Sequence, residues 1–336
     1  MVIDVHAHLY PQAFMAELAS HGPGYGVSLT ADQPPMLCFE GIHFWRYTQA
    51  FHDPTLRLRE MDQAGVDQQV LSLGPPMTYW AQPELALRLC RIFNDEIAKV
   101  IRVHAPRFLG LAALPLQDVD RALPELERAI AELGLSGVGI GSNIHGRPLD
   151  HPSLRPFWER VAALDLPVFI HPINPAGQPD IHDYRLDVAV GFPFDTTIAA
   201  ARIIYSGLLE RHPRLRICLA HLGGALPFLR ERIAIGYRVG REHFRASFGL
   251  SGDPEACLER FYFDTLSYYE PALVAGVACV GADRLVLGSD APFAVGDLAR
   301  SVESIRRFSF LPTGDRAKIL GENALRFLQG AKDLNA

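Results

Sequence analysis

The chain has 336 residues, of which 49% are hydrophobic, 21% charged and 10% aromatic. This balance excludes a disordered or fibrous protein and is typical of a folded protein with a large core. The net charge of −6 provides no basic footprint for nucleic acid, so we expect no nucleic-acid partner.

The sequence predicts neither a secretory leader nor a membrane span. A strand-like run begins at Val2 without a basic leader before it. The longest apolar runs, such as residues 272–280, are about half of the roughly 20 residues that cross a bilayer. The five cysteines contain no C-x-x-C pair, which favours buried thiols in a reducing compartment. We therefore expect a cytoplasmic protein with no membrane partner.

Short apolar runs alternate with helix-length segments along the whole chain. The strand candidates are residues 2–9, 68–73, 108–115, 137–142, 167–171, 216–221, 261–265 and 284–289. The helix candidates are residues 55–64, 83–104, 119–133, 153–164, 196–211, 227–239, 271–280 and 298–308, with a last helix over 315–328. Near-continuous apolar strands separated by helices indicate a parallel sheet covered by helices.

Eight such units predict an α/β protein with one domain over residues 1–336, a (β/α)₈ TIM-type barrel closed by a C-terminal helix. The alternative is an open, doubly wound sheet. No Gly-rich dinucleotide or P-loop fingerprint follows an early strand, which weakens that alternative.

Two long segments interrupt the repeat. Residues 10–53 follow the first strand, are rich in Pro, Gly and aromatic residues, and are expected to be an insertion or lid loop. Residues 174–195 form a second such stretch after the fifth strand. Loops after barrel strands build active sites, although the first segment is also compatible with a small subdomain that serves stability.

The first strand carries a pair of histidines at its carboxyl end. In V-I-D-V-H-A-H-L, alternate side chains share a face, so Asp4, His6 and His8 point the same way. His6 and His8 are then roughly 6.6 Å apart along the strand, a span that two imidazoles can close onto one metal ion.

Three other apolar strands also end in a polar residue. The fifth ends at His171, the sixth at His221 and the eighth at Asp290. Histidines and a carboxylate at a barrel mouth form the ligand set expected for Zn²⁺ or a similar divalent ion. The alternative, that each is only a satisfied buried polar group, is the better explanation for any one residue but not for five at matching strand ends.

Short motifs give the chain a resemblance to a known family. In chain order they are H-A-H-L-Y-P, R-Y-T-Q-A-F-H-D-P, R-E-M-D-Q-A-G-V-D, L-P-L-Q-D, V-F-I-H-P, S-G-L-L-E-R-H-P, L-A-H-L-G-G, L-G-S-D-A-P-F and G-E-N-A-L-R-F-L. Their order and spacing are similar, nearly end to end, to those of the amidohydrolase superfamily (amidohydrolase-2 branch), and within it of the aminocarboxymuconate-semialdehyde decarboxylase family.

The resemblance implies metal ligands at His6, His8, His171 and Asp290, with one ion of Zn²⁺, or alternatively Mn²⁺, per chain. It also implies that His221 is the general acid/base beside a metal-bound water, with Asp290 counted among the catalytic residues. For the substrate it implies three contact residues, Arg46, Arg232 and Phe293. Arg232 matches an arginine that reaches the substrate from the neighbouring subunit, so the resemblance implies a homodimer.

Departures from the family pattern fall in the expected substrate pocket. The chain has His171-Pro172-Ile173 in place of H-P-W and His221-Leu222-Gly223-Gly224 in place of H-G-G-G, Arg46 is offset by one position, and residues 175–195 diverge. Binuclear members bridge two metals with a carboxylated lysine, but no lysine occurs between Lys99 and Lys318. A single metal ion is the consistent interpretation.

We therefore expect a mononuclear metal-dependent decarboxylase acting on a small unsaturated or aromatic carboxylic acid. The metal would lower the pKa of bound water, and His221 would hold or shuttle the proton. Two alternatives stay open at this point. One is a hydrolase that uses the same metal on a lactone, amide or ester, and the other is a binding protein whose metal is structural.

Overall fold

Eight parallel strands form one sheet in the computed structural model, which describes residues 1–175, 181–244 and 248–329. Their order in the sheet is their order in the chain. The strands are β1 (Ile3–His8), β5 (Gln68–Ser72), β6 (Phe108–Ala112), β7 (Gly137–Gly141), β10 (Pro167–His171), β11 (Arg216–Leu219), β12 (Tyr262–Asp264) and β13 (Leu285–Val286). Each predicted strand is present, although several end earlier than expected.

The two edges of this sheet meet, so the strands form a nearly closed barrel. The amide of Val5 donates to the carbonyl of Leu287 at 2.9 Å, and the amide of Asp290 donates to the carbonyl of His6 at 2.8 Å. Ala7 and Ala291 form a parallel bridge. The predicted (β/α)₈ barrel is confirmed.

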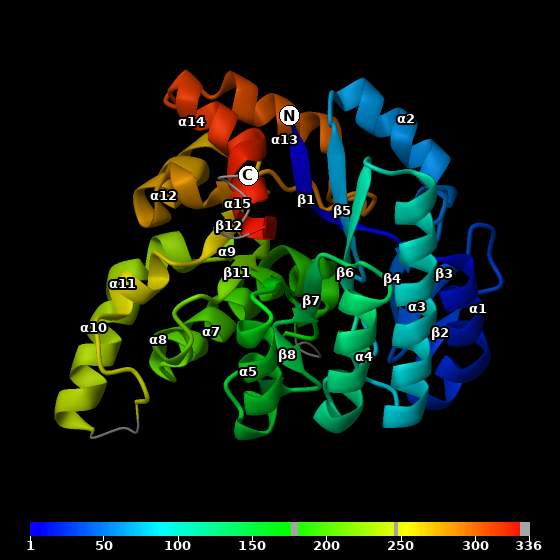
Figure 1. The fold of residues 1–336 in the computed structure, drawn as a ribbon, viewed down its shortest axis with the longest axis horizontal. Helices are drawn as coiled ribbons and strands as arrows, with labels where there is room; N and C mark the ends of the chain where they lie inside the picture. Colours follow the sequence, from blue (N-terminus) through cyan, green and yellow to red (C-terminus); the bar gives the residue numbers. More distant parts are fainter. Residues whose placement is uncertain (176–180, 245–247, 330–336) are drawn as a thin grey trace.

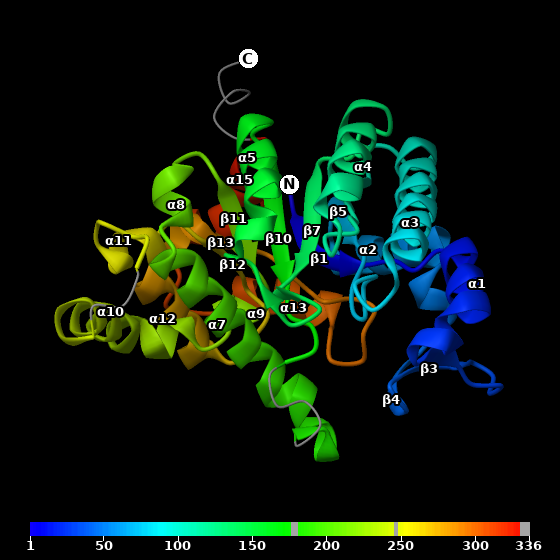
Figure 2. The same cartoon turned by 90° about the horizontal axis from the view of Figure 1, so that it is seen from below.

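Helices cover the outside of the barrel (Figures 1 and 2), and all but the last of them lie between two consecutive strands, whereas α13 follows β13. They are α2 (Pro54–Ala64), α3 (Pro83–Val103), α4 (Val119–Ala131), α5 (Arg155–Ala163), α7 (Phe192–Tyr205), α10 (Leu226–His243), α12 (Glu270–Val280) and α13 (Leu298–Arg307). Aspartates begin several of them. Asp53, for example, accepts from the amides of Thr55 and Leu56 at the start of α2.

The C-terminal segment closes the amino end of the barrel. The predicted helix over 315–328 is present as a continuous helical stretch, made of α14 (Thr313–Ala317), a π-helical turn (Lys318–Glu322) and α15 (Asn323–Gln329). Phe327 of α15 is buried among Ile3, Val5 and Phe169 inside the barrel. Because this end is plugged, the opposite end, where the strands finish, is the open one.

The segment after β1 folds as a small unit beside the barrel rather than as an open loop (Figure 2). It contains α1 (Gln12–His21) and an antiparallel sheet of β2 (Val27–Leu29), β3 (Met36–Phe39) and β4 (Ile42–Arg46). Phe14, Leu18 and Leu37 of this unit join the main hydrophobic core. Its strands were not predicted, because they are short and do not alternate clearly.

The segment after β10 is largely helical in its described part. Residues 174–175 and 181–195 include short helical turns that run into α7, which begins four residues earlier than the helix predicted over 196–211 and ends at Tyr205, before the short α8 (Leu208–Arg211). Within the described residues, Asp183–Tyr205 is long and apolar enough to cross a membrane by length and composition, which corrects the expectation that every apolar run is too short. Half of that stretch is buried in the protein, as in a core helix.

Candidate metal centre

Four side chains converge at the open end of the barrel. His6 and His8 end β1, His171 ends β10, and Asp290 follows β13. The Oδ1 atom of Asp290 lies 3.2 Å from His6 Nε2, 3.1 Å from His8 Nε2 and 3.8 Å from His171 Nε2. All four residues are buried, so the structure brings the predicted ligand set around one carboxylate oxygen.

Each of the three imidazoles has an acceptor behind it. His6 Nδ1 is 2.6 Å from Asp264 Oδ2, and His171 Nδ1 is 2.8 Å from the carbonyl of Pro172. His8 Nδ1 is 3.2 Å from Ser72 Oγ, which itself donates to the carbonyl of Ala7. With the proton on Nδ1 in each ring, all three Nε2 lone pairs face the centre. This second layer of contacts is typical of metal-binding histidines.

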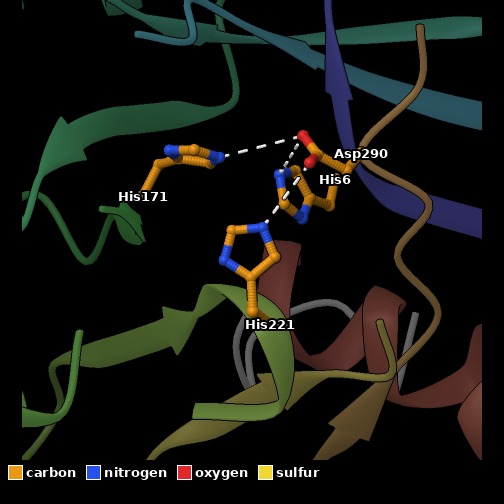
Figure 3. A group of neighbouring side chains, drawn as sticks. All are labelled: His6, His171, His221 and Asp290. Carbon is orange, nitrogen blue, oxygen red and sulfur yellow. Dashed lines mark ion pairs between the residues drawn. The ribbon is translucent and has the colours of Figure 1, made fainter. Parts of the chain in front are cut away.

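His221 approaches from the other side of the carboxylate (Figure 3). Its Nε2 atom lies 3.5 Å from Asp290 Oδ2, the oxygen that the other three histidines do not face. Both His221 and Leu222 have left-handed backbone conformations, with φ near 55°. Asp264 stabilises this turn because its Oδ1 accepts from the Leu222 amide at 3.0 Å.

A glycine makes the turn at His221 possible. Gly224 has φ +66°, and a Cβ atom there would lie 2.0 Å from the carbonyl oxygen of Pro193. Leu222, which stands where the family pattern has glycine, is nevertheless accommodated in the left-handed region, with its side chain buried against Gly276. The departure from H-G-G-G therefore leaves the His221 turn in place.

The electrostatics of the site favour a cation. Burial lowers the pKa of His8 to about 4 and that of His171 to about 3, so both rings are neutral near pH 7 and offer lone pairs. Burial also acts to lower the pKa of His6, but the charges of Asp290 and Asp264 outweigh it and raise that pKa to about 10. Two buried carboxylates thus stabilise one positive charge at this point.

The donor set fits a divalent metal ion. Among the described residues, His171 Nε2 and Asp290 Oδ1 are buried without a hydrogen-bond partner. The donors of His6, His171, His221 and Asp290 lie within 4.8 Å of one another, and His8 is the alternative to His221 as the fourth ligand. We favour His8, because its Nε2 is 3.0 Å from His6 Nε2 and faces the same oxygen of Asp290.

No lysine occurs between Lys99 and Lys318, where a lysine that bridges a second ion would be expected. The strand β7 ends at Gly141, and the next residue, Ser142, donates to the carboxylate of Asp195 at the start of α7. Asn143 contacts the same carboxylate at 3.3 Å. A polar cross-link to α7 therefore follows the end of β7.

A pocket of about 800 Å³ opens above the four ligand candidates. His171, His221 and Asp290 contribute to its floor. Aromatic side chains form much of its wall: the rings of Trp45 and Phe51 stack at 4.4 Å, and Phe293 packs against His8 at 5.2 Å. Both the insertion after β1 and the segment after β10 contribute lining residues, as expected of the two long segments.

The three predicted substrate contacts lie in different places. Phe293 lines the pocket. Arg46 also lines it, but at the rim, where the exposed side chain donates to the carbonyl of Pro34 at 3.3 Å. Arg232 is exposed on α10 and is not among the residues that line this pocket.

Sequence reasoning missed two residues of this region. Asp264 ends the seventh strand in F-Y-F-D-T, so the rule that singled out His171 and His221 would have found it as well. Arg185 lines the pocket from the divergent segment after β10, where no periodic pattern marks it.

Comparisons with known proteins agree with this geometry. Residues 3–330 match the family model described as amidohydrolase. The chain is 37% identical to 2-amino-3-carboxymuconate-6-semialdehyde decarboxylase of Dictyostelium discoideum, over 97% of this chain and 91% of that one. It is 33% identical to gamma-resorcylate decarboxylase of Rhizobium sp. (strain MTP-10005), over 81% of this chain and 86% of that one.

Solved structures give the same picture. 5-Carboxyvanillate decarboxylase of Sphingomonas paucimobilis superposes with a TM-score of 0.85 at 28% identity, covering 98% of both chains. The dihydroxybenzoic acid decarboxylase of Polaromonas sp. JS666, solved with bound manganese and the inhibitor 2-nitroresorcinol, gives a TM-score of 0.78 at 26% identity. That match covers 97% of this chain and 96% of the other.

Proposed function

Because the chain belongs to the amidohydrolase family and is a metal-dependent decarboxylase, we propose that it removes carbon dioxide from a small aromatic or unsaturated carboxylic acid at the barrel mouth. The observation that carries this proposal is the group of three imidazole nitrogens around one oxygen of Asp290, beneath a pocket with aromatic walls. The aromatic walls suit a flat, conjugated substrate, which the rings of Trp45, Phe51 and Phe293 would contact.

His6, His8, His171 and Asp290 would hold one divalent ion, for which we propose Zn²⁺, with Mn²⁺ as the alternative. Imidazole and carboxylate ligands accept both metals, and a related decarboxylase was solved with manganese. When bound, such an ion supplies positive charge that stabilises negative charge developing on the substrate. Elemental analysis should find about one ion per chain, and two tightly bound ions would contradict this assignment.

His221 would deliver the proton that replaces carbon dioxide. In the overall reaction the bond between the carboxylate group and the substrate carbon that carries it breaks, and the electron pair stays on the substrate carbon. A proton from the imidazole then forms the new C–H bond. His221 lines the pocket, and its ring is only partly buried, with 16% of the side chain exposed. Its position beside Asp290 Oδ2 keeps the imidazole near the reacting carbon.

Arg46 would bind a substrate carboxylate at the rim, and we propose that Arg232 reaches the site of a second copy of the chain. Phe228, Ile235 and Val239 on α10 are 89%, 48% and 39% exposed, and their spacing puts them on one face of the helix together with Arg232. Exposed apolar side chains of this size mark interaction surfaces. We therefore propose that the chain forms a homodimer in which this face of α10 is buried.

Incubation with a panel of carboxylic acids tests the reaction. Metal-loaded protein would be given 2-amino-3-carboxymuconate-6-semialdehyde, gamma-resorcylate, 5-carboxyvanillate and a set of pyrone lactones. Release of carbon dioxide from at least one acid is expected. Ring opening of a lactone without carbon dioxide would instead indicate a hydrolase, and no reaction with any compound would favour a binding protein.

A cytoplasmic location is the remaining part of this proposal. It is supported by the five cysteines, which are buried and free of disulfides. Fractionation of cells that express the full chain would test it, with the protein expected in the soluble cytoplasmic fraction.

A further inference from the structure

Arg185 occupies the mouth of the pocket although no family motif includes it. It lies between β10 and α7, in the segment where the sequence diverges from the family pattern, and its side chain is 47% exposed. Tyr184, Val188 and Phe192 of the same stretch also line the pocket. The divergent segment thus adds a guanidinium group to a wall that is otherwise mostly apolar.

The backbone at this position is strained. Tyr184 and Arg185 have φ values of 58° and 61°, in the left-handed region that side chains other than glycine rarely adopt. Two consecutive residues of this kind are uncommon, and such strain concentrates at functional sites. The segment therefore adopts an unfavourable backbone conformation at this point, and that conformation sets the direction of the Arg185 side chain.

Two contacts hold the guanidinium group of Arg185 in place. Its Nη1 donates to the carbonyl of Phe44 in β4 at 2.8 Å, with the guanidinium carbon 5.6 Å from the centre of the Phe44 ring. Its Nε lies 3.5 Å from Oδ1 of Asp187, a fully buried carboxylate. Among the described residues this contact is an ion pair and not a hydrogen bond, and His182 Nδ1 lies 3.7 Å from the other oxygen of Asp187. Arg185 is thus anchored through two of its nitrogens, and among the described residues its Nη2 group has no partner, which leaves it for a ligand.

The other charged groups of the pocket leave a clear place for an anion at its mouth. Asp290, the acidic side chain among the lining residues described, lies on the floor with the histidines, where the reacting carboxylate would go. Arg46, the second arginine of the lining, has one anchoring contact, to the carbonyl of Pro34, whereas Arg185 has two. Arg185 is the better-anchored cation at the mouth.

We propose that Arg185 is a specificity-determining residue, which binds a second anionic group of the substrate, away from the carboxylate that is lost. This inference deepens the proposed decarboxylase function and rests on it for the location of the reacting carboxylate. It predicts that the pocket prefers a dicarboxylic acid to the matching monocarboxylic acid, because a charged hydrogen bond forms with only one of the two.

A matched pair of ligands tests this without any turnover. Isophthalate and benzoate differ by one carboxylate, and calorimetry would give the Kd of each for the metal-loaded protein. The wild type should bind isophthalate about tenfold more tightly or better. Arg185→Met should lose that preference while its Kd for benzoate stays unchanged, and Arg185→Lys should keep part of it. Arg102→Met, at an exposed position on α3, is the control and should behave as the wild type.

Three results would overturn the proposal. The first is a wild type without preference for isophthalate, and the second is an Arg185→Met variant that keeps the preference. The third is an equal loss of affinity for both acids, which would mean that Arg185 only ties β4 to the segment after β10. The calorimetric comparison measures binding alone. If the carboxylic acid panel releases no carbon dioxide, the proposed function is contradicted, but the preference for isophthalate can still be tested.

Discussion

Asp264 connects the two functional halves of the centre. Its Oδ2 contacts His6 Nδ1 at 2.6 Å, and its Oδ1 accepts from the amides of Leu222 and Leu266 at 3.0 Å each. One side chain therefore orients a ligand candidate and also the turn that carries His221. Burial raises the pKa of Asp264, but the bond and charge of His6 outweigh it and keep the carboxylate ionised.

Asp264→Asn separates these two roles. The Asn side-chain oxygen can still accept from the Leu222 and Leu266 amides, but its NH₂ group cannot accept from His6. We expect metal affinity to fall about 10- to 100-fold, as for other residues that orient metal-binding histidines. Chelator competition followed by elemental analysis measures this, with Asp62→Asn, at an exposed position, as the control. Unchanged affinity would show that the bond does not orient His6 for a metal.

His221→Asn tests the proton-donor role. Asparagine tolerates the left-handed conformation found at this position, so the turn should persist. The variant should keep its metal and lose turnover by about 10²–10⁴-fold, the usual contribution of a general acid or base. Metal content and rate constants would be measured on the same preparations, with the exposed His243→Asn as the control. A parallel loss of metal and rate would make His221 a ligand.

At the residue scale, a strand pattern led to side chains that the structure brings together. His6, His8, His171 and Asp290 all follow apolar runs, and the barrel topology brings such ends together. Arg185 could not be predicted in this way. Its position depends on two left-handed residues and on contacts with Phe44, which is 141 positions away.

Asp195 holds together three elements at the barrel mouth. Ser142 and Asn143, which follow β7, both donate to its carboxylate, and Asn143 also donates to the carbonyl of Ile173 after β10. Burial raises the pKa of Asp195 to about 6, although these hydrogen bonds oppose the change. The folded state therefore binds this proton more tightly than the unfolded chain, whose aspartate has a pKa near 3.8.

This difference predicts how stability depends on pH. Between about pH 4 and 6 the folded protein holds the proton and the unfolded chain does not, so the free energy of unfolding falls as pH rises. Over this range the free energy of unfolding should fall by about 3 kcal/mol. Asp195→Asn should abolish this pH dependence, because the amide does not titrate. Urea unfolding from pH 4 to 7 measures both profiles. Parallel profiles for the wild type and the variant would contradict a titrating Asp195.

At the level of elements, the sequence predicted what has a strong pattern. The barrel strands are continuous apolar runs because both faces of a parallel sheet are buried, and all eight were found. The insertion sheet was not, because β2 and β3 have only three and four residues and gain their burial from neighbouring elements. The last predicted helix is helical throughout, but it contains a π-helical turn at Lys318–Glu322 that the sequence pattern does not mark.

On the scale of the whole molecule, the open question is whether one chain makes a complete site. Arg232 lies on α10, on the same face as the exposed Phe228, Ile235 and Val239, and it is absent from the pocket lining of its own chain. If Arg232 serves the site of a partner, its loss in one chain damages the other chain's site. Sedimentation velocity should first show a dimer for the wild type and for each variant.

Two mixed dimers then give opposite outcomes. In the first, one chain carries Arg232→Ala and the other His171→Ala. The Arg232→Ala chain keeps its metal ligands and receives Arg232 from its partner, so one working site per dimer should appear. In the second, one chain carries both substitutions and its partner is wild type. That wild-type site lacks Arg232 from across the interface, so no site should bind substrate with normal affinity.

If Arg232 acts within its own chain, the first dimer is impaired at both sites and the second keeps one working site. Carbon dioxide release would be measured on dimers purified with two different affinity tags. For each mixed dimer, Arg232 acting in the partner's site and Arg232 acting in its own chain predict opposite results.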